Sequence, residues 1–155
     1  MKLERVTRSE EETAAVGREI ASLLPRDGVI HVIGDLGAGK TTLIRAIASE
    51  LGADPLEVAS PTFAIVHEYP LPDGPAIVHI DGYRLSSSRR EWLEIGIDEI
   101  LSSPGLKFIE WPKAEFGDFA QRIAEISVRV GGDESRIIQM TSQKPEARSQ
   151  KKRRS

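Results

Sequence analysis

The sequence predicts an α/β protein with a mixed, mostly parallel sheet flanked by helices and a C-terminal β-hairpin. Short apolar runs alternate along the chain with segments whose apolar residues have helical spacing. A glycine-rich turn, Gly34 to Thr41, joins one such run to a helical segment and fits the pattern G-x-x-x-x-G-K-[ST]. Near the C-terminus, two strand-like segments flank Gly131-Gly132. Together these observations indicate a P-loop NTPase-like architecture.

Length and charge divide the chain into a body and a tail. The 155 residues suffice for one domain with a hydrophobic core, which we expect at residues 1–143. Residues 144–155 contain six basic residues and one acid, a charge of +5, so the body carries −8 of the net charge of −3. An acidic body disfavours broad nucleic-acid binding by the folded domain. The tail is expected to be disordered, and it could contact tRNA.

The composition also bears on location. The sequence contains no cysteine, which excludes disulfides and cysteine-based metal or thiol chemistry. The N-terminus lacks the apolar core of a signal peptide, and no apolar stretch approaches the length that spans a membrane. We therefore expect a cytoplasmic protein without membrane contact.

The first half of the chain reads as helix, strand, loop and helix. Ser9 and Glu12 form a capping-box pattern that starts a helix, and Pro25 with Gly28 ends it. Val29 to Ile33 is apolar on both faces and suits a central strand; His31 within it is interpreted as a packed core residue. After the glycine-rich turn, apolar residues at helical spacing run to Leu51, and Gly52 is a plausible C-cap.

The second half predicts further strands and one helical region. Residues 64–69 and 76–81 read as strands that could pair as a hairpin, which would make the sheet mixed. Residues 86–103 have helical character, with a break at Gly96. Residues 106–110 form another short strand. The segments that end at Val130 and begin at Arg136 alternate apolar and polar residues as the C-terminal hairpin.

The glycine-rich turn has the chemistry of a phosphate-binding loop. Its backbone must curl so that its amides point at phosphate oxygens, and side chains at Gly34, Gly37 or Gly39 would fill that space. Lys40 supplies a mobile cation for the terminal phosphates, and the Thr41 hydroxyl suits Mg²⁺. The following helix directs its partly positive end at the anion.

Two acids follow predicted neighbouring strands, where the ligand site of such folds lies. Asp81 and Glu110 can hold a Mg²⁺-bound water or accept a proton from an attacking water. His79 lies on the same strand face as Asp81, so it either orients that carboxylate or is simply packed. Thr62, within Ser60 to Phe63, occupies the place of a switch threonine, although a proline turn explains that segment equally well.

Four motifs in this order resemble the bacterial TsaE (YjeE) family, the ATPase of tRNA threonylcarbamoyladenosine biosynthesis. They are Gly34 to Thr42, Ser60-Pro61-Thr62-Phe63, His79 to Leu85, and Ile109-Glu110-Trp111-Pro112. The resemblance implies a Mg²⁺-dependent, ATP-hydrolysing domain that works with TsaD and TsaB partners. Together they would install the threonylcarbamoyl group on the adenosine beside the anticodon of tRNA.

The same resemblance implies roles for individual residues. ATP is expected at the loop, bound through Gly34, Asp35, Gly37, Ala38, Gly39, Lys40, Thr41 and Thr42. Thr41 and Glu110 would hold Mg²⁺, and Asp81 would assist the metal or the water. Thr62 would belong to the switch-like loop, Trp111 would lie next to the nucleotide, and Glu10 would lie near the base. Lys40, Asp81 and Glu110 are thus the expected catalytic residues.

Two other functions fit parts of the sequence. A small-molecule or nucleoside kinase could use Ser86 to Glu91 as a lid, with Arg89 and Arg90 on phosphate, but no segment looks available for an acceptor pocket. A nucleotide-gated binding module is the third possibility. For an ATPase, Arg84, Arg89, Arg90 or a partner's arginine could supply the arginine finger, and hydrolysis without partners is expected to be weak.

Overall fold

A computed structural model describes residues 1–59, 64–85, 88–112 and 122–142. Thr62 and the expected tail at 144–155 lie outside the described residues, so the predictions for them are untested. In chain order the elements are β1 (Lys2–Thr7), α1 (Glu10–Leu23), β2 (Gly28–Gly34), α2 (Lys40–Glu50), α3 (Pro55–Ala59), β3 (Val66–Leu71), β4 (Gly74–Asp81), a 3₁₀ turn η1 (Gly82–Arg84), α4 (Arg89–Glu94), α5 (Ile97–Ser102), β5 (Leu106–Glu110), β6 (Arg122–Val130) and β7 (Arg136–Ser142). No described helix is long and apolar enough to cross a membrane.

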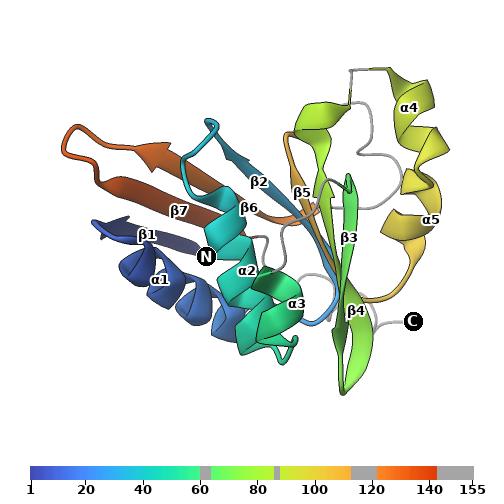
Figure 1. Ribbon diagram of the computed structural model, residues 1–155, viewed down its shortest axis with the longest axis horizontal. Helices are drawn as coiled ribbons and strands as arrows, with labels where there is room; N and C mark the ends of the chain where they lie inside the picture. The colour runs from blue at the N-terminus through green and yellow to red at the C-terminus, as the bar shows by residue number, and fades with distance from the viewer. Residues whose placement is uncertain (60–63, 86–87, 113–121, 143–155) are drawn as a thin grey trace, which may run out of the picture.

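The described strands form one seven-stranded sheet in the order β1-β7-β6-β2-β5-β4-β3 (Figure 1). The central strands β6, β2, β5 and β4 run parallel to one another. The antiparallel pairs β1–β7, β6–β7 and β3–β4 make the outer parts of the sheet. The predicted fold class is therefore confirmed, with a C-terminal hairpin and a mixed sheet whose parallel strands lie at its centre.

Strand β1 is an element that the sequence analysis did not predict. It lies at the edge of the sheet and pairs only with β7 among the described strands, from Lys2 opposite Thr141 to Thr7 opposite Arg136. Leu3 and Thr7 are buried, whereas Val6 is exposed, so the sequence shows no clear apolar alternation. The strand forms because β7 offers a partner far along the chain, which a local pattern cannot reveal.

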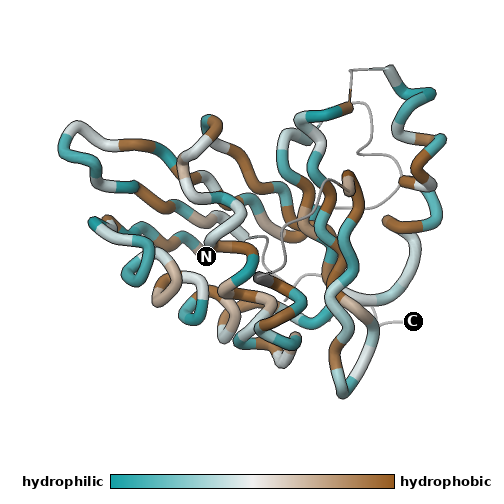
Figure 2. The backbone as a smooth tube through the Cα atoms, viewed as in Figure 1, coloured by the Kyte–Doolittle hydropathy of each residue, from teal (hydrophilic) through white to brown (hydrophobic). Residues whose placement is uncertain are grey.

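Two apolar clusters fix the sheet from its opposite faces. The larger packs α1 and α2 on one face and includes Ile30, Ile77 and Phe108. The smaller packs α4 and α5 on the other face and includes Val78, Ile109 and Trp92. The strands β2, β4 and β5 contribute residues to both clusters, because successive side chains point to opposite faces. Figure 2 shows the hydrophobic segments concentrated along the central strands.

The helix boundaries follow local chemistry. At the start of α1, Ser9 Oγ accepts from the Glu12 amide at 3.1 Å, as the capping-box pattern predicts. The Glu12 carboxylate accepts from the Arg8 amide at 3.1 Å, one residue earlier than the reciprocal bond of that pattern. Between α4 and α5, Gly96 adopts a left-handed φ of 80°, which separates the helices at the predicted break.

His31 makes the stability of the fold depend on pH. Burial lowers the pKa of His31 below 6.5, so the folded chain favours the neutral ring. Between that lowered pKa and 6.5 the unfolded chain binds more protons, and the free energy of unfolding therefore falls as the pH drops below about 6.5. His31→Gln, which does not titrate, should show a shallower fall in urea unfolding measured from pH 7.5 to 5. Burial also lowers the pKa of His67, so part of the pH dependence of stability should remain in the variant. An equal pH dependence in variant and parent would contradict the role of His31.

Candidate functional site

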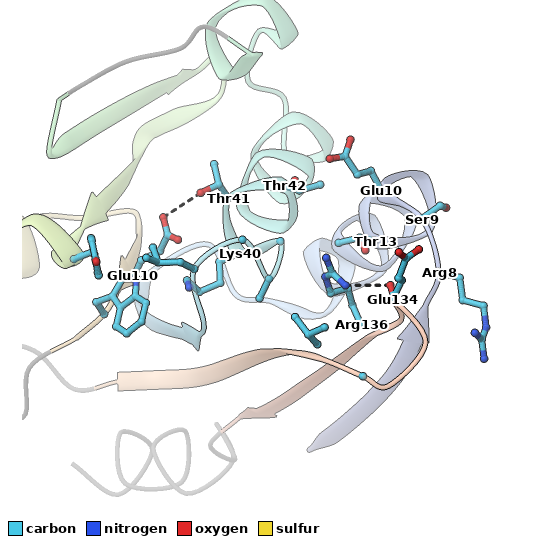
Figure 3. A pocket seen from close by; sticks show the side chains of 18 of the residues that line it. Arg8, Ser9, Glu10, Thr13, Lys40, Thr41, Thr42, Glu110, Glu134 and Arg136 are labelled. Carbon is cyan, nitrogen blue, oxygen red and sulfur yellow. Dashed lines mark hydrogen bonds between the residues drawn. The ribbon is translucent and has the colours of Figure 1, made fainter.

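The site is a cavity of about 900 Å³ at the carboxyl edge of the central strands. Because β2, β4, β5 and β6 are parallel, the segments that follow them meet at this edge. The cavity is lined by the start of α1, the glycine-rich loop with the first turn of α2, the ends of β4 and β5, and the β6–β7 loop. Figure 3 shows Thr41 and Glu110 facing each other on one side of Lys40, with Glu134 and Arg136 nearer the start of α1.

The loop has the backbone that a phosphate cradle needs. Gly34 has a φ of 149°, and a Cβ there would lie 2.2 Å from the Val128 carbonyl oxygen of β6. Gly39 caps α2 with a left-handed φ of 106°, and the first intrahelical bond runs from the Leu43 amide to the Gly39 carbonyl. The amides of the first helical turn therefore have no intrahelical acceptor and point out of the helix end, which attracts anions.

Lys40 is held inside the loop that precedes it. Its Nζ donates to the carbonyl oxygens of Gly34 at 2.5 Å and Asp35 at 2.8 Å, and it lies 4.6 Å from the centre of the Trp111 ring. Burial lowers the pKa of Lys40, while Glu110, Asp35 and Asp81 act in the opposite direction. The ammonium group thus donates two hydrogen bonds within the loop. Lys40 is also the first residue of α2, so this group belongs to the helix end that attracts anions.

Glu110 and Asp81 are neighbours at the ends of adjacent strands. They are paired in the register of β4 and β5. Glu110 Oε2 accepts from Thr41 Oγ1 at 3.4 Å, whereas Asp81 Oδ1 accepts from the Tyr83 amide at 3.2 Å. Gly82 permits this close approach, because a Cβ there would lie 2.5 Å from the Glu110 carbonyl oxygen. Two carboxylates and one hydroxyl therefore converge beside the loop.

An aromatic pair forms the wall next to these acids. Trp111 follows β5 with a φ of 55°, a left-handed conformation that is uncommon for a large side chain. Its ring lies 5.2 Å from that of Tyr83, which is half exposed. The unusual backbone turns the Trp111 ring toward Lys40 and the cavity.

The structure brings most of the predicted site residues together. The cavity is lined by Glu10, Gly37, Ala38, Gly39, Lys40, Thr41, Thr42, Asp81, Glu110 and Trp111. Gly34 and Asp35 shape the loop and accept the Lys40 bonds without lining the cavity. Arg89 and Arg90 begin α4, where Arg90 pairs with Glu94 at 3.2 Å, and neither lines the cavity. Arg84 pairs with Asp81 at 3.7 Å.

The C-terminal hairpin and Arg8 also line the cavity, although the sequence did not predict a role for them. Arg136 and Glu134 line the cavity, and Arg136 donates to the Glu134 carbonyl oxygen at 3.0 Å. The hairpin pattern was visible, but its place beside the loop depends on the parallel pairing of β6 with β2. That pairing joins segments far apart in sequence, so no local pattern indicates it.

The sequence matches the family model of the threonylcarbamoyl adenosine biosynthesis protein TsaE over residues 7–138. The chain belongs to the TsaE family. A TsaE protein of Bacillus subtilis is 34% identical over 85% of this chain and 80% of its own length. A TsaE protein of Treponema pallidum is 33% identical over 86% of this chain and 96% of its own. The crystal structure of Bacillus subtilis YdiB superposes with a TM-score of 0.68 at 28% identity, covering 96% of this chain and 90% of that one.

Two glycines of the TsaE-family loop make a contrast that tests its geometry. Gly34→Ala combines a strained φ with a clash against backbone, and it should lower the free energy of unfolding by about 2 to 5 kcal/mol. Gly37→Ala has a φ of 75° but open space around its Cβ, so its cost should be only about 1 to 2 kcal/mol. Urea denaturation followed by circular dichroism measures both. Equal losses in the two variants would contradict the close approach to Val128.

Proposed function

We propose that this chain is a Mg²⁺-dependent ATPase of tRNA threonylcarbamoyladenosine biosynthesis that acts with TsaD and TsaB homologues in the cytoplasm. The observation that carries the proposal is the meeting of a phosphate loop, Lys40 and two carboxylates in one cavity of a TsaE-family chain. The curated relatives are named for tRNA threonylcarbamoyladenosine biosynthesis, which supports the pathway. Contact with tRNA would be indirect or would involve the basic tail.

Several groups that line the cavity would serve to bind ATP. The loop and the first turn of α2 supply amides for phosphate oxygens, and Lys40 can exchange its two carbonyl acceptors for them at little cost in hydrogen bonds. Trp111 and Tyr83 offer apolar surface at one side. Glu10, Arg8 and Arg136 line the region at the start of α1 and supply polar groups for the nucleoside, consistent with the expected position of Glu10 near the base.

The donor set suits Mg²⁺. Thr41 Oγ1, Glu110 and Asp81 provide only oxygen ligands, which this ion prefers. Among the described residues no group of three or more His, Cys, Asp or Glu side chains could hold a metal ion. Mg²⁺ is often held by one or two protein groups together with substrate phosphates, and Thr41 and Glu110 would be those groups here. When bound, the ion would neutralise charge that develops on the phosphates.

The protein side chains then have separate tasks. Lys40 would contact the terminal phosphates as a point charge. Asp81 would orient the attacking water and accept its proton, because its side chain is about one-third exposed at the cavity while Glu110 is buried. Glu110 and Thr41 would position the metal. A partner's arginine is the favoured arginine finger, since Arg84 already pairs with Asp81 and Arg89 and Arg90 lie away from the cavity.

Turnover and tRNA modification test this proposal directly. In a mixture of the chain, TsaD and TsaB homologues, ATP and tRNA, Lys40→Ala and Glu110→Ala should each lower the hydrolysis rate by about 100-fold or more. Modified tRNA, measured by nucleoside mass spectrometry, should fall in parallel. Arg90→Ala, a change at an exposed residue outside the cavity, serves as the control and should match the parent. Undiminished tRNA modification in both loop and acid variants would refute the proposal.

A further inference from the structure

Behind Glu110 lies a buried row of polar side chains that the proposed reaction does not itself require. His79 Nε2 lies 2.5 Å from Glu110 Oε2, and the Tyr69 hydroxyl lies 3.3 Å from His79 Nδ1. Tyr69, His79 and Glu110 are 3%, 5% and 6% exposed. Buried polar groups destabilise a fold unless each one has a hydrogen-bond partner. These three side chains bond to one another in a row that leads to Glu110, which points to a role at that carboxylate.

The chemistry of the three groups assigns the direction of each hydrogen bond. An ionised carboxylate only accepts, so His79 Nε2 must hold the proton that points at Glu110. With the Nε2 tautomer of a neutral ring, Nδ1 is an acceptor, and the Tyr69 hydroxyl lies where it can donate to it. Glu110 Oε2 also accepts from Thr41 Oγ1. Two donors from opposite sides therefore hold one carboxylate oxygen.

The sheet register places these side chains in a diagonal row. His79 of β4 is opposite Phe108 of β5, so Glu110 is its diagonal neighbour two residues on. Tyr69 of β3 is opposite Ile77 and is likewise diagonal to His79. The row crosses three strands on the face covered by α2 and ends at Thr41. His79 thus contacts Glu110 of the next strand, whereas its sequence position suggested either a contact with Asp81 or simple packing.

The helix α2 also bounds the far end of the row. Arg45, one turn after Thr41, acts on the Tyr69 hydroxyl and offsets part of the rise that burial causes in the pKa of Tyr69. The helix α2 thus bonds to Glu110 through Thr41 and acts electrostatically on Tyr69 through Arg45. Rotation of the Glu110 side chain would break bonds on both sides of it.

We propose that His79 and Tyr69 are positioning residues that fix the Glu110 carboxylate for its metal ion. The inference rests on the proposed function. A glutamate has three side-chain torsions, and a Mg²⁺ site demands near-ideal geometry, so an unsupported Glu110 would bind the ion less tightly. His79 supplies the fixed donor, and Tyr69 fixes which ring nitrogen donates.

The variants that test this move the donor of residue 79, remove it, or remove the Tyr69 hydroxyl. His79→Gln puts an amide donor near the position of Nε2, His79→Asn puts one near Nδ1, out of reach of Glu110, and His79→Met has no N–H donor. Tyr69→Phe retains the buried ring and loses the hydroxyl. For each variant the full chain is titrated with ATP, with and without Mg²⁺, by calorimetry, and the kcat and KM for ATP are measured with partners.

We expect the Met and Asn variants to raise the half-saturating Mg²⁺ concentration by about 10-fold or more and to lower kcat, while affinity for ATP without metal stays unchanged. The Gln variant should recover most of the Mg²⁺ affinity and most of kcat. Tyr69→Phe should change the half-saturating Mg²⁺ concentration and kcat by less. In a double variant with His79→Met it should cause no further change. Thermal unfolding of each variant separates this effect from loss of fold. In the ligand-free parent, ¹⁵N–¹H correlation spectra should place the His79 proton on Nε2.

The outcomes that would contradict this inference differ from the outcome that would contradict the proposed function. A His79→Met chain with the parent's Mg²⁺ dependence, a Gln variant as impaired as Asn, or a proton on Nδ1 overturns the inference and leaves the proposed ATPase intact. A parent chain that binds no ATP with Mg²⁺ overturns the proposed function and this inference with it.

Discussion

Parallel pairing at the centre of the sheet is the constraint on which the site depends. β2, β5 and β4 run in one direction, so the loop after β2 and the acids that end β4 and β5 arrive at the same edge. Reversal of any one strand would move its terminal residue to the opposite edge. β6 runs parallel to β2 as well, which brings the β6–β7 loop to the cavity. Five segments separated in sequence thereby line one site.

The glycine-rich loop holds the Lys40 ammonium group through its own carbonyl oxygens. Lys40 would otherwise be a partly buried ammonium group without acceptors, which is expensive. The carbonyl oxygens of Gly34 and Asp35 take up its donors, and the Trp111 ring lies beside it. The loop can hold this shape because its glycines adopt φ values that other residues reach only under strain. The backbone of the loop is therefore shaped by its glycines, and its lysine is held within it.

Local patterns predicted much of this arrangement, and their success has a physical limit. The Ser9 cap, the break at Gly96, the strand from Leu106 to Glu110 and both hairpins depend on chemistry within a few residues, and the structure contains them. Edge strand β1, the role of Arg136 and the partner of His79 depend on pairing between distant segments. His79 shares a strand with Asp81, yet its hydrogen bond crosses to the next strand. The sequence predicted which polar residues lie at strand ends. The register between strands determined which of these residues contact one another.

The strand β5 lies between the two apolar clusters, and this packing explains why Glu110 is both buried and held in one position. Phe108 packs into the cluster under α1 and α2, and Ile109 packs into the one under α4 and α5. Both faces of the strand are thus anchored immediately before its last residue. The side chain of Glu110 follows the alternation of Phe108 and so turns to the α2 face, where Thr41 and His79 lie. A shift of β5 by one residue would turn Glu110 to the opposite face, so the packing of both cores maintains the geometry of the site.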